Sequence, residues 1–204
     1  MIRQTDPRTI AFLKRTGHGA ATALIIACCW LGSAGMSAAA EIEGVHFADR
    51  YQAGAITLPL KGVGLARFLF SVKVYVAALY LSKEVPPEKI LSDVPKRLEL
   101  QYFQPISGPD FGRAAEDVMA ENVPASTIAS LRPRIARLHS LYENVKPGDR
   151  YALTYVPGVG TELALNGIPK GTIEGEDFAA AYFAIWLGPK PISTGLKSQM
   201  LAGP

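Results

Sequence analysis

Short apolar runs rich in β-branched and aromatic residues occur in two separate parts of the chain, and such runs indicate strands. They predict strands at 55–60, 66–72, 74–81, 97–103, 150–156, 161–165 and 168–173. Apolar and polar residues alternate in 97–103, so one face of that strand is expected to be buried. We expect Gly62-Val63-Gly64 to form a flexible turn and residues 70–73 to form the turn of a hairpin. Asn166-Gly167 predicts a second hairpin, because both residues accept positive φ angles.

Apolar residues at three- and four-residue spacing lie between and after these two groups of strands. They predict helices at 110–122, 125–142, 176–187 and 193–201. Pro133 predicts a kink or a break near Arg132. The order of strands, helices, strands and helices lacks a regular βαβ alternation, which favours an α+β fold with an antiparallel sheet and helices on one face. No linker divides residues 41–204, which we expect to form one domain.

The first forty residues have the three-part organisation of a signal peptide. Basic residues occupy 1–15, an apolar stretch runs over 20–31, and small residues end at Ala38-Ala39-Ala40. This pattern predicts cleavage after Ala40 and export of residues 41–204, to the periplasm if the source is bacterial. The apolar stretch is about a dozen residues long, short of the ~20 that cross a bilayer. We therefore expect no membrane span in the processed protein.

Charge and cysteine content also change at residue 40. The net charge is +3, but the first forty residues hold four basic residues against one acid, so residues 41–204 are neutral. Both cysteines, Cys28 and Cys29, belong to the leader, which excludes a disulfide scaffold, a cysteine-ligated metal and a thiol nucleophile from residues 41–204. Residues 25–28 loosely match a lipoprotein signal, so an anchor through an acylated Cys28 remains an alternative.

Metal, cofactor and nucleic-acid chemistry have little support in the processed chain. Only His46 and His139 remain there, without metal-ligand spacing, and no signature of a serine nucleophile is present. The glycines at 158–171 lack the strand and helix that flank a phosphate-binding loop, so no cofactor is expected. Arg132, Arg134 and Arg137 favour a solvated helix face rather than a nucleic-acid partner.

One charged residue, Arg67, interrupts an apolar strand. Tyr75 lies across the predicted hairpin from it. A buried guanidinium requires an acceptor, and an arginine beside a tyrosine hydroxyl in an apolar cavity suits a carboxylate or an oxyanion. The pattern alone leaves a second interpretation open, in which Arg67 points outward into solvent.

A set of motifs in this order resembles the chalcone isomerase-like family, in its bacterial exported branch, over nearly all of 42–201. The motifs are Leu60–Arg67 (LKGVGLAR), Lys73–Leu81 (KVYVAALYL), Val145–Asp149 (VKPGD), Tyr155–Thr161 (YVPGVGT), Leu165–Gly167 (LNG), Phe183–Gly188 (FAIWLG) and Leu196-Lys197. The resemblance implies an open-faced β-sandwich, in which helices are layered on one face of a large antiparallel sheet with a ligand cleft between them.

The resemblance also implies roles for three residues. Arg67 matches the arginine that steadies the developing enolate in the plant isomerases, where a threonine on the following strand assists it. Tyr75 occupies that threonine position, and its interval from Arg67 is shorter than in the plant enzymes. An Arg–Tyr pair is instead similar to the fatty-acid-binding members, in which the pair holds a carboxylate. Tyr102 is a further candidate for a polar contact, with a core or rim tyrosine as the alternative.

Three hypotheses follow. The leading one is an exported, non-catalytic protein that binds a small hydrophobic carboxylate such as a fatty acid through Arg67, Tyr75 and Tyr102. The second is an intramolecular lyase, an isomerase acting on a phenolic enone, with Arg67 and Tyr75 as catalytic residues. The third is a structural accessory protein of the envelope whose cleft is filled by side chains.

Overall fold

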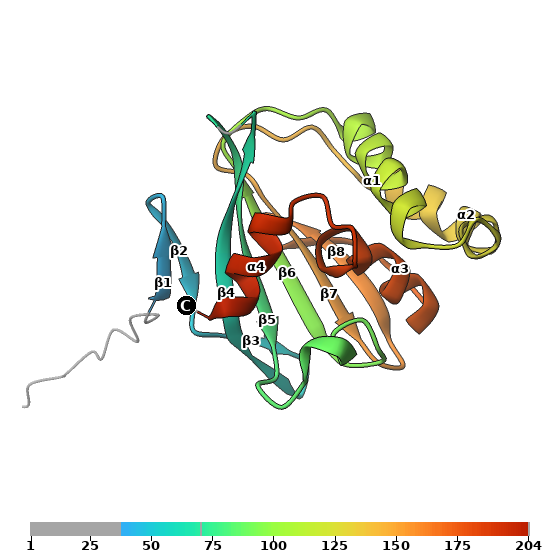
Figure 1. Cartoon of the computed structure of the whole chain (residues 1–204), viewed down its shortest axis with the longest axis horizontal. Helices are drawn as coiled ribbons and strands as arrows, with labels where there is room; N and C mark the ends of the chain where they lie inside the picture. Colours follow the sequence, from blue (N-terminus) through green and yellow to red (C-terminus); the bar gives the residue numbers. More distant parts are fainter. Residues whose placement is uncertain (1–37, 70, 204) are drawn as a thin grey trace, which may run out of the picture. The chain divides into compact units, whose positions relative to one another are not determined.

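The computed structural model describes residues 38–69 and 71–203 (Figure 1). The predicted leader, with Cys28, therefore lies outside the described residues except for Ala38–Ala40, which belong to the first strand. Two strands form a hairpin of their own, β1 (Ala38–Ile42) and β2 (Val45–Ala48). The helical segments are η1 (Pro87–Lys89), a 3₁₀ turn, and α1 (Gly108–Asn122), α2 (Ala125–His139), α3 (Glu176–Leu187) and α4 (Thr194–Ala202).

The main sheet has seven strands in sequence order, and every neighbouring pair is antiparallel. Its strands are β3 (Arg50–Ala53), β4 (Ile56–Phe68), β5 (Val72–Leu81), β6 (Lys96–Tyr102), β7 (Arg150–Val156), β8 (Gly160–Leu165) and β9 (Ile168–Ile173). The Asn166-Gly167 hairpin forms as predicted, with φ angles of 52° and 79°. Strands β1, β2 and β3 were not predicted from the sequence, so they are an addition to the predicted fold.

The sheet separates two hydrophobic cores, and strand alternation explains how one strand serves both. Successive side chains point to opposite faces of a sheet. On β5, Ala77 and Leu79 therefore pack beneath the helices, while Val76, Ala78 and Tyr80 pack against the β1–β2 hairpin. Figure 1 shows α3 and α4 lying across the sheet. This arrangement confirms the predicted α+β fold and the open-faced β-sandwich with helices on one face.

Strand β4 corrects the predicted turn at Gly62-Val63-Gly64. The strand continues through these residues, and its pairing with β5 shifts by one residue between Leu60 and Gly62. This bulge turns the following even-numbered residues toward the helices. A Cβ on Gly64 would lie 2.9 Å from Leu196 Cδ1, and one on Gly62 would overlap the main-chain carbonyl of Met200. The glycines are thus required for the close approach of α4 rather than for a turn.

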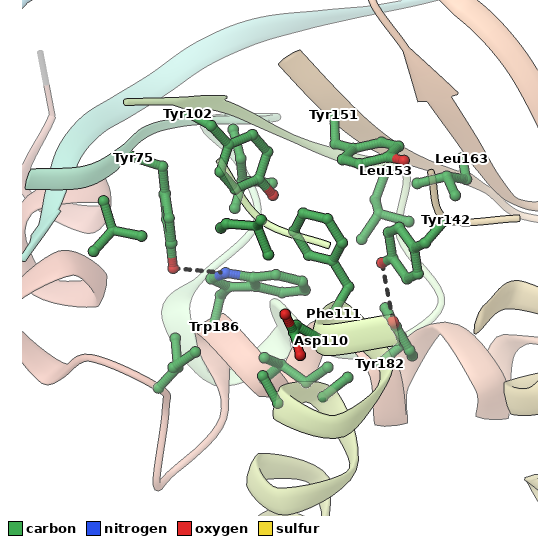
Figure 2. Close-up of a pocket in the computed structure, with 17 residues that line it drawn as sticks. Tyr75, Tyr102, Asp110, Phe111, Tyr142, Tyr151, Leu153, Leu163, Tyr182 and Trp186 are labelled. Carbon is green, nitrogen blue, oxygen red and sulfur yellow. Dashed lines mark hydrogen bonds between the residues drawn. The ribbon is translucent and has the colours of Figure 1, made fainter. Parts of the chain in front are cut away.

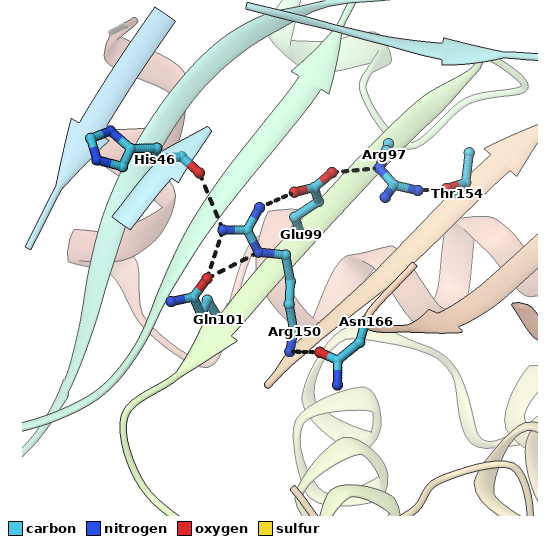
Figure 3. Close-up of polar contacts among 7 residues, drawn as sticks. All are labelled: His46, Arg97, Glu99, Gln101, Arg150, Thr154 and Asn166. Carbon is cyan, nitrogen blue, oxygen red and sulfur yellow. Dashed lines mark hydrogen bonds and ion pairs between the residues drawn. The ribbon is translucent and has the colours of Figure 1, made fainter. Parts of the chain in front are cut away.

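Strand β6 is buried on both faces, although the alternation predicted only one buried face. Arg97, Glu99 and Gln101 face the β1–β2 side and form a polar network there with Arg150 (Figure 3), whereas Lys96 lies on the helical side, over the rings of Tyr155 and Phe183. Glu99 accepts hydrogen bonds from Arg97 Nε at 2.9 Å and from Arg150 Nη1 at 3.0 Å. Arg150 also donates to the main-chain carbonyl of His46 in β2, at 3.2 Å. The charged side chains on this face of β6 can be buried because Glu99 is paired with both Arg97 and Arg150.

Helix α2 is continuous through Pro133, so the predicted break does not occur. The helix ends at His139, three residues before the predicted end at 142. Buried Leu131, Ile135 and Leu138 hold it against the core on either side of the proline. Within the described residues, no helix combines the length and the apolar character that crossing a bilayer requires.

Candidate functional site

A cavity of about 250 Å³ lies between the helical side of the sheet and helices α1 and α3 (Figure 2). Its aromatic lining residues are Tyr75, Tyr102, Phe111, Tyr142, Tyr151, Tyr182 and Trp186. Its aliphatic lining residues are Val74, Leu100, Ile106, Ala114, Ala115, Leu153, Leu163, Ile185 and Ile192. Asp110, in the first turn of α1, is the one charged residue of the lining within the described part of the chain.

Register and helix placement bring the aromatic residues together. Tyr75 on β5 and Tyr102 on β6 are directly paired in the antiparallel ladder, so their side chains leave the sheet on the same face. Their ring centroids are 5.7 Å apart in an edge-on arrangement. Trp186 on α3 reaches the same place from the helical layer, and its indole Nε1 donates to the Tyr75 hydroxyl at 3.2 Å.

Four of the five tyrosine hydroxyls in the lining are hydrogen-bonded within the protein. Tyr75 accepts from Trp186, and the Tyr142 and Tyr182 hydroxyls lie 3.0 Å apart. The Tyr151 hydroxyl accepts from the main-chain nitrogen of Glu143 at 2.7 Å. The Tyr102 hydroxyl has no hydrogen-bond partner among the residues that the structure describes. Its oxygen points into the cavity in Figure 2, so this hydroxyl can pair with a ligand, and the Tyr75 hydroxyl, which accepts from Trp186, also keeps its proton as a donor.

Burial keeps these phenols neutral. It raises the pKa of Tyr75 to about 12, although the Trp186 hydrogen bond acts in the opposite direction. The pKa of Tyr102 is raised well above its usual range, mainly by burial and further by the neighbouring tyrosines. Tyr102 therefore keeps its proton at physiological pH and can donate a hydrogen bond. Proton transfer from it would form an unpaired phenolate in an apolar cavity, which is unfavourable.

The Asp110 carboxylate of the lining belongs to an ion pair with Arg113, and its side chain is 46% exposed. Hydrogen bonds from the Ser107 hydroxyl and the Arg113 guanidinium lower the pKa of Asp110, so its carboxyl group is ionised at neutral pH. No lysine, arginine or histidine lines the cavity within residues 38–69 and 71–203. The cavity can thus enclose an apolar group and accept one hydrogen-bonding group from it, but it offers no cation to an anion.

Arg67 lies outside this cavity, which differs from the expectation that it faces a cleft. Ala66 is directed toward the helices, so the next residue along β4 is directed to the β1–β2 side. The Arg67 side chain is 41% exposed and lies 3.4 Å from Glu43, whose carboxylate also pairs with Lys73. The structure therefore brings Tyr75 and Tyr102 together but leaves Arg67 at the surface, as the solvated interpretation expected.

The sequence interpretation missed most of the cavity lining. Tyr182 and Trp186 belong to the predicted helix 176–187, and both are buried and line the cavity. Their four-residue spacing on α3 places them on one side of the helix. That spacing is also typical of an ordinary core helix, so only the packing of α3 against the sheet, which brings Trp186 to Tyr75, distinguishes the two roles.

Together, the curled antiparallel sheet, the one-sided helical layer and the cavity between them define an open-faced β-sandwich with an internal aromatic site. A family model described as chalcone isomerase-like matches residues 39–202. The chain belongs to the chalcone isomerase-like family.

Among solved structures, the chain is similar to a fatty-acid binding protein of Arabidopsis thaliana. The TM-score is 0.58 at 16% sequence identity, and the similar region covers 78% of this chain and 92% of the Arabidopsis chain. At this identity the similarity concerns the fold. A search of curated proteins found no match.

Proposed function

We propose that this protein binds a small hydrophobic ligand in the aromatic cavity without transforming it chemically. The observation that carries the proposal is a mainly apolar cavity into which the Tyr102 hydroxyl points, with no hydrogen-bond partner among the residues that the structure describes. An apolar lining with a few convergent polar groups is typical of ligand sites. The Arabidopsis protein of similar fold is described as a fatty-acid binding protein, which supports a ligand of fatty-acid type.

The volume of the cavity favours a small ligand. Ligand pockets commonly measure about 300–1,000 Å³. At about 250 Å³, this cavity is at the lower end of that scale. A short or medium acyl chain suits it better than a long one.

The charges around the cavity favour a ligand whose polar end is uncharged. Burying an ionised carboxylate without a cation costs several kcal/mol. The Asp110 carboxylate of the lining already pairs with Arg113, and Arg67 lies on the other face of the sheet, where it pairs with Glu43. A carboxylic acid would therefore bind in its protonated form, with its carbonyl oxygen accepting from the Tyr102 hydroxyl.

The isomerase hypothesis has less support from the geometry. It required Arg67 to stabilise an oxyanion, and the Arg67 guanidinium is paired with Glu43 at the surface. The neutral phenols of the lining can donate hydrogen bonds but supply no charge. The hypothesis of a structural protein expected a cleft filled by side chains, and the cavity of about 250 Å³ counts against it.

Export remains part of the proposal and rests on the leader alone. Cleavage after Ala40 would shorten β1 to Glu41 and Ile42, which still pair with His46 and Val45 in β2. Amino-terminal sequencing of the protein recovered from the periplasm would test it. A start at Glu41 is expected, and a start at Cys28 would indicate a lipoprotein.

Calorimetric titration of the purified protein with 1-octanol and octanoic acid tests the binding proposal. We expect Tyr102→Phe to weaken binding of both probes about 5- to 10-fold, because it removes one hydrogen bond worth about 1 kcal/mol and leaves the ring in place. Arg67→Ala is the matched control and is expected to leave both affinities unchanged. Equal binding by Tyr102→Phe and the unmodified protein, together with a loss in Arg67→Ala, would overturn the proposed site.

A further inference from the structure

The turn between β4 and β5 exposes a contiguous set of apolar side chains. Phe68 is 61% exposed, Leu69 is 72% exposed and Val72 is 43% exposed. We call these three residues the apolar tip; Phe70, between them in the sequence, lies outside the described residues. Leu69 has a φ of 47°, in the left-handed region that leucine seldom adopts. The turn thus holds a large apolar residue where glycine or asparagine is usual, and that residue is 72% exposed.

Cations lie at the base of the apolar tip. Arg67 and Lys73 are paired across the β4–β5 ladder, immediately inside the tip. Both side chains are more than 40% exposed, at 41% and 45%, and both contact the single carboxylate of Glu43. Two cations against one anion leave the base of the tip with a net positive charge.

The apolar tip lies at the same end of the sheet as one side of the cavity. Val74, two residues after the tip, belongs to the cavity lining, and so does Ile106 in the loop from β6 to α1. That loop is attached to the strand beside the tip, because the main-chain nitrogen of Phe103 donates to the Val74 carbonyl at 2.8 Å. The Gln104 side chain donates to the Lys73 carbonyl at 3.3 Å. In Figure 1 the β4–β5 turn and the β6–α1 loop are at the same edge of the molecule's folded domain.

We infer that the apolar tip docks into the surface of a lipid bilayer. Apolar side chains projecting from a positively charged base match the two layers of a bilayer surface, which are acyl chains beneath anionic headgroups. Phe68, Leu69 and Val72 enter the boundary between headgroups and acyl chains. Arg67 and Lys73 remain at the level of the headgroups and attract anionic lipid.

A second copy of the chain is a poorer occupant of the tip. A stable protein interface buries about 800 Å² on each partner. Even an aromatic side chain buries only about 150–250 Å². Three side chains on a narrow hairpin turn therefore fall short of that area. Insertion into a bilayer has no such minimum, because each apolar side chain contributes separately at about 25 cal/mol per Å².

Docking in this orientation would bring the Val74–Ile106 side of the cavity next to the lipid. An apolar ligand could then pass between bilayer and cavity with little exposure to water. This consequence rests on the proposed binding function, whereas the docking itself does not.

Fluorescence of a tryptophan placed in the tip tests the docking. We compare Leu69→Trp with Ile168→Trp, because Ile168 is 63% exposed in a different hairpin and makes a matched control. Both full-length variants, with identical leaders, are mixed with phosphatidylglycerol-containing vesicles whose acyl chains carry bromine as a quencher. After subtraction of the signal from the unmodified chain, we expect quenching at position 69 to be at least about twice that at 168, since only the inserted residue approaches the acyl chains.

Two further arms complete the test. Lys73→Gln in the Leu69→Trp chain is expected to reduce quenching by anionic vesicles and not by neutral phosphatidylcholine vesicles. Equal quenching at positions 69 and 168 would overturn the inference. It would also be overturned if emission at position 69 changed with protein concentration in the absence of vesicles, because that result identifies a second copy as the occupant. Neither readout depends on ligand binding, so failure of the docking is distinguishable from failure of the proposed function.

Discussion

Tyr102 differs from the other tyrosines of the cavity in the pairing of its hydroxyl, which has no partner among the described residues. Tyr75, Tyr142 and Tyr151 each share a hydrogen bond within the protein. A typical hydrogen bond contributes about 0.5–1.5 kcal/mol net. A ligand acceptor at the Tyr102 hydroxyl adds such a bond without breaking one inside the protein, so this residue is expected to orient a ligand.

The affinity for octanoic acid is predicted to increase as the pH falls. Lowering the pH from 7.5 to 5.5 raises the uncharged fraction of a carboxylic acid of pKa about 4–5 by roughly 100-fold, and the apparent affinity should follow if only that form binds. Over this range Tyr102 keeps its proton, because its pKa is raised far above, and Asp110 stays ionised, because its pKa is lowered.

Calorimetric titrations at several pH values measure this effect. The matching titration with 1-octanol is the control, and its affinity is expected to stay constant because the alcohol does not titrate in this range. An octanoic acid affinity that rises with pH would mean that the carboxylate is the bound form, which contradicts the account of an uncharged polar end.

Sequence reasoning located part of the cavity lining. The family resemblance made Tyr75 and Tyr102 candidate ligand contacts, which stays a prediction, and both residues line the cavity. Arg67 was assigned to the same side because an apolar run surrounds it in the sequence. Its direction depends on the bulge after Leu60 and on the β1–β2 hairpin that provides Glu43, and neither feature has a signal in the local pattern.

Strand β4 and helix α4 pack so closely that the residue types of one limit those of the other. The two glycines of β4 present a flat surface onto which α4 packs, with Leu196 and Met200 buried against it. Glycine inside a strand is unfavourable for the strand itself. Its presence twice within three residues is explained by the close approach of the helix backbone.

Gly62→Ala is therefore predicted to destabilise the protein. The added methyl group would overlap the main-chain carbonyl of Met200, and backbone cannot move aside as a flexible side chain can. Forced overpacking of this kind costs about 1–3 kcal/mol. Denaturant unfolding followed by circular dichroism measures the loss.

Gly195→Ala is the matched control for this prediction. A Cβ at Gly195 meets no atom within 4 Å, and the residue lies in the first turn of α4. The control is expected to be unchanged or more stable by no more than about 1 kcal/mol. If Gly62→Ala were as stable as this control, the packing of α4 on β4 would be contradicted.

The helices and strands that were predicted correctly are those with local sequence signals. Helices α1 and α3 and the hairpin at Asn166-Gly167 were predictable because spacing and turn chemistry are local signals. Gly62-Val63-Gly64 was expected to be a turn because glycine pairs favour turns locally, and the tertiary contact with α4 reversed that preference. Pro133 likewise predicted a break that packing of α2 against the core prevents.

In the folded domain, the two faces of the sheet differ: one is closed by packing and the other lines the cavity. The β1–β2 face is closed by apolar packing and by the network of Arg97, Glu99 and Arg150, in which Glu99 has both arginines as partners. The helical face keeps the cavity. A fixed sheet with its second face fully occupied provides the rigid support on which a preorganised binding site depends. The ion network on the β1–β2 face is thus structural, and the proposed binding role belongs to the neutral phenols of the helical face.

We propose that an apolar ligand occupies the aromatic cavity with its polar end at Tyr102. The position of a brominated ligand in a crystal structure tests this proposal directly. Crystals of the protein grown with 8-bromooctanoic acid would reveal the bromine by anomalous diffraction and the carboxyl group by its density. We predict bromine inside the cavity and the carboxyl group within hydrogen-bond distance of the Tyr102 hydroxyl. A carboxyl group bound at Arg67, with the cavity empty, would contradict the account.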